Sequence, residues 1–274
     1  MFDEVNGLMC LRALVDESTL EYPIKEELLL CFLRARKYNV DRAFKSVSIE
    51  SLLSNSTKLI FIKICFNRQL KNYMKMVKNY PELFTNLSAH KLRFQLKEQL
   101  QIVYKSRDKQ GRRIFIFRAG RWNPKECSLD DIFRCNLFCL QQLASNLDSQ
   151  INGIVAIVDL ENLSLNQARH FTPNYAKKIA ELLIETFPIS FQIIHIVNQN
   201  WIVHTLMSII WPFLSPKIQK RLLYHGSCWA SLHEYVDAAD LPEDYGGFRE
   251  RLDCLKLSET KVPIDETCNL FNLN

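Results

Sequence analysis

The clearest structural signal in the chain is the stretch GIVAIVDL, residues Gly153–Leu160. It is an apolar run of strand length, which predicts a central strand buried on both faces of a sheet. A second run of this kind follows at Phe191–Val197. Between them, Thr172 and Pro173 supply an N-cap and a proline at the first helical position, and they open a helix with an apolar stripe. Strand, helix and strand in this order predict parallel pairing, with helices covering the sheet.

On the N-terminal side of this unit, the sequence predicts a hairpin and a helix. Gln101–Lys105 and Arg113–Arg118 read as two strands joined by a turn. Ser128 followed by Asp131 at the third position resembles a capping box, which opens a helix that we expect to run to Leu147. The apolar residues expected on one face of this helix are Phe133, Leu137, Leu140, Ala144 and Leu147.

The first third of the chain reads as helices. Glu26–Lys37 has an apolar face and a basic last turn that suits the helix dipole, whereas residues 46–69 match no single element. The length of 274 residues gives a prior of about two domains. We expect an α/β protein with a helical N-terminal domain at residues 1–90, which contains an atypical insertion at 46–69, then an α/β domain with a mostly parallel sheet at 91–248, and a tail at 249–274.

Composition excludes several classes of protein. The 7 glycines form no phosphate-binding run of the Rossmann or P-loop kind, and the net charge of +5 is small for a dedicated nucleic-acid binder. The 9 scattered cysteines, without a CxxC pair, are typical of buried thiols in a reducing compartment. Charged residues interrupt residues 1–20, so these form no signal peptide, and no apolar run is long enough to span a bilayer. We therefore expect a soluble cytoplasmic protein.

The most unusual stretch is WIVHTLMSIIWPFL, residues Trp201–Leu214. On a helix its only polar side chains, His204, Thr205 and Ser208, fall in one narrow strip and leave well over half of the circumference apolar. Such a helix either packs deep in the core, or closes an apolar cavity and meets a membrane when it moves. With Pro212 inside it, the stretch is too short to cross a membrane.

A basic segment follows this stretch directly. Pro216 restarts the chain as a helix that carries Lys217, Lys220, Arg221 and His225. Apolar surface beside basic residues is typical of an interfacial membrane contact, where each Lys or Arg near anionic lipid contributes about 1 kcal/mol. The alternative is an ordinary solvated helix face.

Several ordered motifs of the chain resemble one known family. They are LLLCFLRARKYNVDRAF (28–44), FTPNYAKKIAELLIETFP (171–188), IIHIVN (193–198), WPFLSPKIQKRLLYHG (211–226) and LPEDYGG (241–247). In this order they resemble the CRAL-TRIO lipid-binding family, most closely its branch of alpha-tocopherol transfer and retinaldehyde-binding proteins. The resemblance covers nearly the whole chain except residues 46–69 and the C-terminal end.

This resemblance implies a function. It implies non-enzymatic carriage of one tocopherol-like, retinoid-like or phospholipid-like ligand at a time, in a hydrophobic cavity that lies between sheet and helices and is closed by a mobile lid helix. It implies no cofactor, no metal and no catalytic residue, and a cytoplasmic protein that docks transiently on anionic membranes. We also expect a monomer. Burying about ten carbons contributes about 8 kcal/mol, enough for micromolar binding without catalysis.

The resemblance also assigns positions to the ligand site. Its cavity lining carries over to Phe133, Asn136, Leu137, Leu140, Ile154, Val158, Leu163, Leu165, Ile179, Leu183, Phe187, Phe191 and Ile194. Its lid positions carry over to Val203, Leu206, Met207, Ile210 and Leu214. Ordinary core packing is the alternative at each position. Asn136 is the exception, because an amide among apolar neighbours needs a hydrogen-bond partner, which a ligand hydroxyl or carbonyl can supply.

The family's phosphoinositide-binding positions match this chain less well. They fall on Val77, Ser190, Gln192, Lys217 and Arg221, of which only the last two are basic. We therefore expect attraction to anionic membranes, with phosphoinositides among the candidate lipids and with Lys217 and Arg221 as headgroup contacts. Whether a phosphoinositide triggers release stays open at Val77, Ser190 and Gln192. Trp211 stands where the family has a basic residue, and its ring suits insertion at the headgroup boundary.

Two other functions compete with this one. A hydrolase would use His225, Cys228 and His233, but the chain has no GxSxG or HExxH motif, and this cluster has no fourth ligand for zinc. An RNA-binding module would use residues 91–121, where ten basic against two acidic residues give a net charge of +8, interleaved with the rings of Tyr104, Phe115 and Phe117. The opposing interpretation is that these basic residues pair with the acidic segment 234–266 and that the rings face the core.

Overall fold

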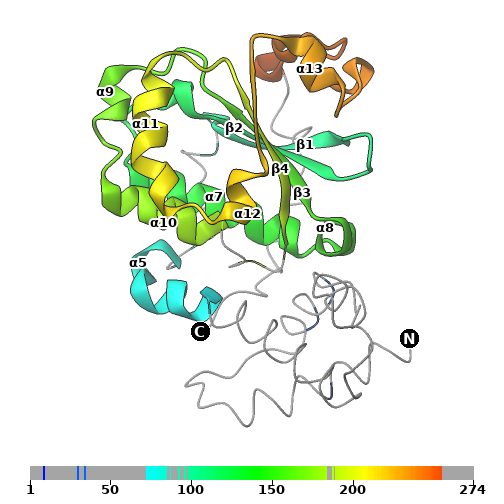
Figure 1. Cartoon of the computed structure of the whole chain (residues 1–274). Helices are drawn as coiled ribbons and strands as arrows, with labels where there is room; N and C mark the ends of the chain where they lie inside the picture. The colour runs from blue at the N-terminus through cyan, green and yellow to red at the C-terminus, as the bar shows by residue number, and fades with distance from the viewer. Residues whose placement is uncertain are drawn as a thin grey trace.

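The computed structural model describes residues 72–84, 87, 92, 96, 98–183, 187 and 189–254, together with Met9, Leu30 and Arg34. Of the helix predicted at residues 26–37, Leu30 and Arg34 are described and are helical. The insertion predicted at 46–69, most of the domain predicted at 1–90 and most of the tail predicted at 249–274 lie outside the described residues. Figure 1 shows how the described elements are arranged.

A five-stranded sheet forms the centre of the described part. Its strands lie side by side in the order β1-β2-β3-β4-β5. β1 pairs antiparallel with β2 and the other three pairs are parallel, so the predicted α/β class with a mostly parallel sheet is confirmed. The strands are β1 (Gln101–Arg107), β2 (Arg113–Arg118), β3 (Ile154–Asp159), β4 (Phe191–Val197) and β5 (Leu222–Gly226).

β1 and β2 form the predicted hairpin, with β1 extending to Arg107. Asp108 fixes the turn, because its Oδ1 accepts hydrogen bonds from the backbone N–H groups of Gln110 (3.0 Å) and Arg112 (2.7 Å). Gly111 has a φ of +77°, a left-handed conformation that glycine adopts without a steric penalty. Local turn chemistry therefore sets the register of the hairpin.

The helix after the hairpin is α7, Leu129–Ala144. Ser128 and Asp131 form the predicted capping box at its start. The predicted end at Leu147 is wrong, because the Asn146 side chain caps a second helix, α8 (Leu147–Asn152), by accepting a hydrogen bond from the Asp148 N–H. Leu147 is consequently 49% exposed instead of lying on the buried face of α7.

The remaining helices lie in the crossovers between parallel strands. α9 (Leu165–Ala168) and α10 (Pro173–Leu183) connect β3 to β4, and α10 begins at Pro173. α11 (Ile202–Ile210), the 3-10 turn η2 (Trp211–Phe213) and α12 (Pro216–Gln219) connect β4 to β5. The basic helix predicted from Pro216 is therefore a single turn, and the chain continues into a strand that the sequence pattern did not predict.

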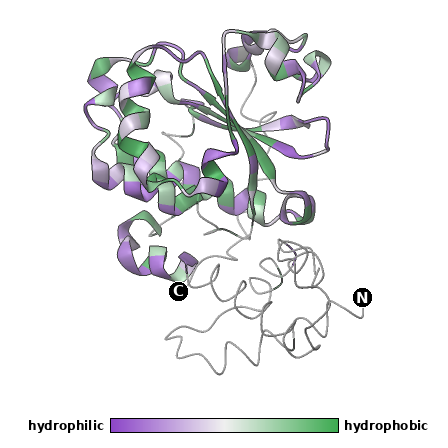
Figure 2. Ribbon diagram, in the orientation of Figure 1, coloured by the Kyte–Doolittle hydropathy of each residue, from purple (hydrophilic) through white to green (hydrophobic). Residues whose placement is uncertain are grey.

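Side chains of the strands alternate between the two faces of the sheet. One face, which includes Phe115, Ala156 and Ile194, packs in a cluster with residues of α7, α10 and α11. The other, here called the back face, includes Ile116 and Ile157 in a separate cluster with residues of α13 (Trp229–His233) and of the segment after it. Figure 1 shows α13 on the opposite side of the sheet from α7 and α10, and Figure 2 shows the hydrophobic strands between these layers.

A helical layer before the hairpin packs on α7. Residues 72–79 are helical and are followed by α5 (Pro81–Phe84). Tyr73 and Leu83 are fully buried in the same cluster as the apolar side of α7. The Tyr73 ring meets Phe187 edge to face, with 5.7 Å between centroids. This layer extends the core beyond the sheet.

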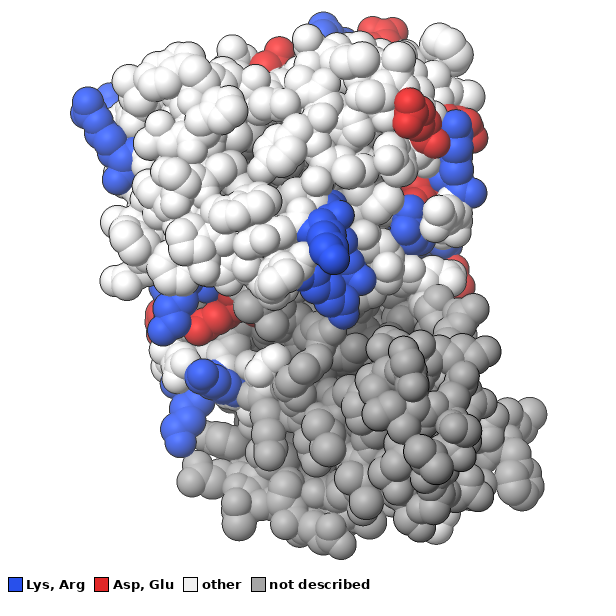
Figure 3. Space-filling view, viewed as in Figure 1, with Lys and Arg blue, Asp and Glu red and all other residues white. Residues whose placement is uncertain are grey.

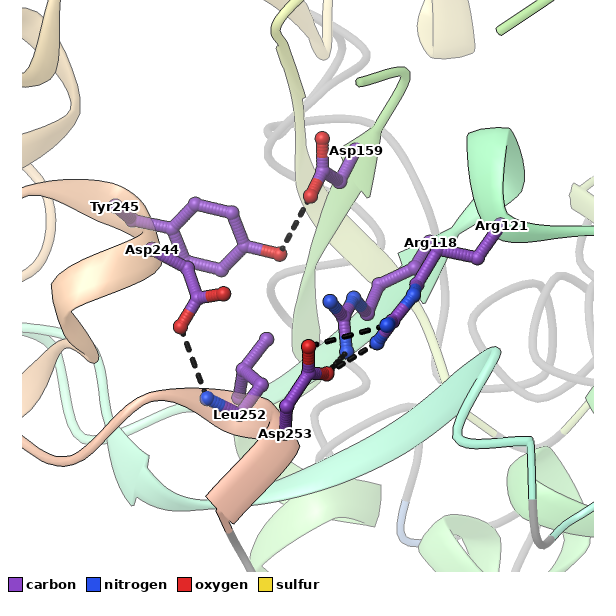
Figure 4. Close-up of polar contacts among 7 residues, drawn as sticks. All are labelled: Arg118, Arg121, Asp159, Asp244, Tyr245, Leu252 and Asp253. Atoms are coloured by element: carbon purple, nitrogen blue, oxygen red, sulfur yellow. Dashed lines mark hydrogen bonds and ion pairs between the residues drawn. The ribbon is translucent and has the colours of Figure 1, made fainter. Parts of the chain in front are cut away.

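The C-terminal segment is tied to the carboxyl ends of β2 and β3. The Tyr245 hydroxyl donates to Asp159 Oδ2 (3.2 Å). The Asp253 carboxylate accepts a hydrogen bond from Arg118 (2.7 Å) and one from Arg121 Nη2 (3.0 Å), as Figure 4 shows. These contacts hold the segment over the back face.

Candidate ligand-binding cavity

A cavity of about 220 Å³ lies between the sheet and the layer of α7, α10 and α11. Its wall is almost entirely hydrocarbon, because the strands turn alternate apolar side chains toward it. The residues that line it are Phe115, Phe117, Ala119, Trp122, Leu129, Ile132, Phe133, Asn136, Leu140, Ala156, Val158, Leu160, Leu163, Phe171, Tyr175, Ile179, Leu182, Leu183, Phe191, Ile194, Ile196, Val203, Leu206, Met207, Ile210, Leu214 and Leu222.

Most positions that the family resemblance assigned to the ligand site lie around this cavity. Those in its wall are Phe133, Asn136, Leu140, Val158, Leu163, Ile179, Leu183, Phe191 and Ile194. Four others are not in the wall. Leu137, Ile154 and Phe187 are buried in the surrounding core, and Leu165 is 50% exposed on α9. Contact with a ligand stays a prediction for all thirteen.

The five predicted lid positions also face the cavity. Val203, Leu206, Met207 and Ile210 come from α11, and Leu214 follows η2. The opposite side of α11 carries the polar strip predicted from the sequence, because His204, Thr205 and Ser208 are exposed there. Exposed apolar side chains lie instead at the two ends of the helix, at Trp201 (65% exposed) before it and at Trp211 and Phe213 after it.

Asn136 is the one wall residue with an amide, acidic, basic or aliphatic hydroxyl side chain. Its Oδ1 is buried and has no hydrogen-bond partner. The other polar wall groups are engaged: Trp122 Nε1 donates to the Cys127 carbonyl (2.7 Å). Burial raises the pKa of Tyr175, and the charge of Asp130 and its hydrogen bond with this tyrosine raise it further. A buried acceptor without a partner is costly, so Oδ1 is the place where a ligand donor gains most.

Sequence reasoning missed one end of the cavity. Trp122, Phe171 and Tyr175 line it beside the first turn of α7, where Leu129 and Ile132 also face inward. The helical spacing of Leu129, Ile132, Asn136 and Leu140 could have revealed the inward face of α7. Trp122 follows a 3-10 turn and carries no periodic signal.

The predicted headgroup positions come together only in part. Arg221 donates through Nη1 to the Phe191 carbonyl, and Gln192 Nε2 donates to Ser190 Oγ (2.5 Å), so these three positions are neighbours. Lys217 lies exposed on α12, and Val77 is partly buried against the core. Figure 3 shows basic side chains gathered over α12, beside a surface over α11 that carries no charged side chain on the visible face.

The cluster proposed for a hydrolase does not converge. His225, expected on the exposed basic segment, is buried on β5, where its ring nitrogens contact His195 Nδ1 (2.9 Å) and Ser231 Oγ (2.7 Å). His233 Nε2 contacts the Tyr245 carbonyl (3.0 Å) instead. Within the described residues, no group of His, Cys, Asp and Glu is placed to hold a metal ion.

The surface proposed for RNA is used by the fold itself. Tyr104 and Phe115 are buried, and Phe117 lines the cavity, so the prediction that these rings face the core is confirmed. Lys109 pairs with Asp237 (3.3 Å), in addition to the pairs of Arg118 and Arg121 with Asp253. The basic and acidic segments therefore meet across the fold.

The fold and its cavity define a class: an α/β protein that encloses a hydrophobic cavity between a mostly parallel sheet and a helical layer. Residues 97–247 match the CRAL/TRIO domain. The chain belongs to the CRAL-TRIO family, and the predicted resemblance is confirmed. In the described part of the chain, no helix has both the length and the apolar character needed to cross a membrane.

Individual relatives agree with this assignment. The human "Alpha-tocopherol transfer protein-like" is 33% identical over 247 residues, which make up 88% of this chain and 66% of that protein. Clavesin-1 of Xenopus laevis is 33% identical over 224 residues, 81% of this chain and 60% of that protein. The chain thus spans less than two thirds of these relatives. The crystal structure of Sfh5 shares the fold, with a TM-score of 0.57 at 12% identity, covering 96% of this chain and 92% of that chain.

Proposed function

We propose that this chain binds a small hydrophobic ligand in the cavity and transfers it between membranes without chemical change. The observation that carries the proposal is a wall of apolar side chains around about 220 Å³, in which the Oδ1 of Asn136 is buried without a hydrogen-bond partner. Such a wall contributes binding free energy through burial of the ligand, at about 0.8 kcal/mol per methylene. The proposal is also supported by the family to which the chain belongs, because one of the relatives is named "Alpha-tocopherol transfer protein-like".

The Asn136 side chain narrows the kind of ligand. Its amide accepts hydrogen bonds through Oδ1 and donates them through Nδ2, and a ligand hydroxyl complements both. A ligand with several polar groups or a charge would leave them unpaired against hydrocarbon, at a cost of several kcal/mol. The favoured ligand is therefore a largely apolar molecule with one hydroxyl, of which a tocopherol-like or retinoid-like alcohol is an example.

In the same proposal, α11 is the lid and its surroundings are the membrane contact. α11 closes the cavity with Val203, Leu206, Met207 and Ile210, and the exposed Trp211 follows it directly. Lys217 and Arg221, with Lys220 between them, attract anionic lipid next to this ring. The carrier acts as a cytoplasmic monomer that docks transiently. A phosphoinositide-specific site is not part of the proposal, because Val77, Ser190 and Gln192 carry no positive charge.

Lipid extraction tests the carrier function. Protein purified from eukaryotic cells is washed, extracted with organic solvent and measured by mass spectrometry against protein concentration. We expect close to one lipid per chain, and a titratable site after delipidation. Protein that contains no stoichiometric lipid and binds none on titration would sink the proposal.

Vesicle binding tests the membrane contact. Replacing Lys217 by Gln is expected to weaken binding to vesicles containing phosphatidylserine about fivefold, since one Lys near an anionic surface contributes about 1 kcal/mol. Lys105→Gln is the matched control, because Lys105 is exposed on β1, at the opposite edge of the sheet from β5. Equal binding by both variants would place the membrane contact elsewhere.

A further inference from the structure

One end of the cavity is built around Trp122. This residue is only 4% exposed and lines the cavity beside Phe171 and Tyr175. Its ring meets His170 and Phe171 edge to face, at centroid distances of 5.4 Å and 6.3 Å. Aromatic pairs in this arrangement have a preferred geometry, so the ring is held on more than one side. The end of the cavity at the first turn of α7 is therefore a wall of interlocked rings.

Hydrogen bonds fix this wall from behind. Trp122 Nε1 donates to the Cys127 carbonyl (2.7 Å). The buried Gln167 donates from Nε2 to the carbonyl oxygens of both Trp122 (2.6 Å) and Gly120 (2.9 Å). Gln167 is itself held, because its Oε1 accepts the Ser164 N–H (2.7 Å) in the capping box of α9. A rotation of the indole would break its bond to the Cys127 carbonyl, and a shift of the Trp122 backbone would break the bonds from Gln167. Both movements therefore cost free energy.

The backbone next to Trp122 is braced as well. A Cβ atom added at Gly120 would lie 1.6 Å from the Glu161 carbonyl oxygen. The 3-10 turn before Trp122 therefore packs backbone to backbone against the loop after β3, with no room for a side chain. This contact prevents the turn from retreating when the cavity is filled.

The side of the cavity under α11 is different. Met207 and Ile210 are only partly buried. The N-terminus of the helix is held by Asn200, whose Oδ1 accepts the Ile202 N–H (3.0 Å) and whose Nδ2 donates to the Leu163 carbonyl (2.9 Å). The residue after α11, Trp211, is 42% exposed. The cavity-facing side chains of α11 are apolar and are held by packing alone, whereas Trp122 is held by a buried hydrogen bond, so the cavity has one fixed end and one side that can be displaced at lower cost.

From this asymmetry we infer that Trp122 is the residue that sets the length of the ligand. The inference rests on the proposed carrier function and deepens it. Along α7, the wall runs from Leu129 to Leu140, eleven residues or about 16 Å at 1.5 Å per residue. Asn136 lies seven residues from Leu129, so a hydroxyl bound to it leaves about 10 Å for an apolar chain that ends at Trp122.

The test is a titration of delipidated protein with straight-chain primary alcohols, from butanol to hexadecanol. Affinity for the wild-type protein should rise about fourfold per added methylene, reach an optimum and then fall, because a longer chain meets Trp122. Trp122→Ala should move the optimum to longer alcohols and raise affinity for the longest at least tenfold. Trp122→Phe, which keeps a smaller ring, should shift it less. Phe248→Ala, which removes an aromatic ring that is 80% exposed and lies outside the cavity wall, is the control and should leave the optimum in place.

Each outcome bears on a different claim. If the Trp122 variants bind alcohols with the wild-type optimum, or lose affinity equally for every length, the inference is overturned while the carrier function stands. If wild-type protein binds no alcohol and no extracted lipid, both fall. Thermal unfolding checks that each variant folds. Should Trp122→Ala not fold, Phe171→Ala enlarges the same end of the cavity and is expected to move the optimum in the same direction.

Discussion

The two faces of the sheet are made from alternate residues of the same strands, yet they are covered in different ways. On the back face, Ile116 and Ile157 are completely buried against α13 and the segment after it, in a core that includes Tyr245. On the other face, Phe115 and Ile194 border a cavity. Both sets of strand residues are apolar, so the strands do not determine which face is hollow. The difference arises from the layer that covers each face.

Polar groups are also handled differently on the two faces. On the back face, His225 contacts His195 and Ser231, and Tyr245 donates to Asp159, although His195 Nε2 is buried without a partner. On the cavity face, Asn136 Oδ1 has no partner and lines an open space. Paired polar groups hold a structure together, and an unpaired one favours a ligand where a cavity gives the ligand room. The comparison predicts that changes on the back face affect stability, whereas changes around the cavity affect binding.

The largest expected effect is on the back face. Tyr245→Ala should lower the free energy of unfolding by about 3–5 kcal/mol, because it empties a fully buried site and removes the bond to Asp159. Phe133→Ala in the cavity wall should cost less, since one side of that ring already faces empty space. Urea unfolding followed by circular dichroism measures both, and Phe248→Ala, at an 80% exposed position, serves as control. An equal decrease in the free energy of unfolding for Tyr245→Ala and Phe133→Ala would contradict the predicted difference between the two faces.

Acid should weaken the back face. Burial, and then the positive charges of His225 and Arg112, lower the pKa of His195 from 6.5 to about 3. The unfolded chain therefore binds more protons below pH 6.5, so stability is complete above that pH and falls as the pH drops toward 3. The loss from this group is about 2 kcal/mol at pH 5.

Urea unfolding at a series of pH values measures this loss. His195→Gln should flatten the pH dependence between 6.5 and 4. His204→Gln, at an exposed position on α11, should leave it unchanged. A wild-type protein equally stable at pH 7 and pH 5 would show that the buried imidazole does not contribute.

A smaller effect is expected at Asn136, and on binding rather than stability. Asn136→Leu removes the unpaired acceptor and should leave the free energy of unfolding unchanged or slightly higher. Affinity for a long-chain alcohol should fall about fivefold relative to the alkane of equal length, the value of one neutral hydrogen bond of about 1 kcal/mol. Calorimetric titration with both probes gives the ratio. An unchanged preference would remove Asn136 from the ligand site.

The smallest effect is expected at the C-terminal segment. Although partial burial alone would raise the pKa of Asp253, hydrogen bonds and charges from Arg118 and Arg121 lower it overall. Asp253 and Arg121 are exposed, and an asparagine would still accept a hydrogen bond from the buried Arg118, so Asp253→Asn should cost less than about 1 kcal/mol, and added salt should shrink the difference. Thermal unfolding at low and high salt measures it. If the loss of stability in Asp253→Asn is the same at low and high salt, the residue contributes through packing rather than through charge.

The sequence predicted those elements that depend on local chemistry. The capping box of Ser128 and Asp131 and the apolar strand at residues 154–159 need only their own neighbours. It failed where an element depends on distant parts of the chain. β5 is short and carries Tyr224 and His225, so nothing in its pattern marks it as a strand. Trp122 joins the cavity only because Gln167 and the loop after β3 hold it there.

The candidate site was predicted in the same uneven way. Positions such as Asn136 and Leu206 came from motif resemblance and do lie in the cavity wall. Leu165 did not, because it begins a four-residue helix whose direction no spacing fixes. The sequence showed that His204, Thr205 and Ser208 form one polar side of α11. It did not show that this side faces outward, because the direction of the helix depends on how β4 and β5 pair in the sheet.

The crossover that contains α11 has a kinetic consequence. It leaves the sheet at β4 and returns at β5, and these two strands pair with each other. Because both ends of this crossover are fixed in the sheet, α11 stays at a high effective concentration near its position over the cavity. Its return after any displacement is a first-order step, with a rate independent of how much protein is present. The rate of ligand exchange at the cavity should then be set by a unimolecular rate constant, which dilution of the protein does not change.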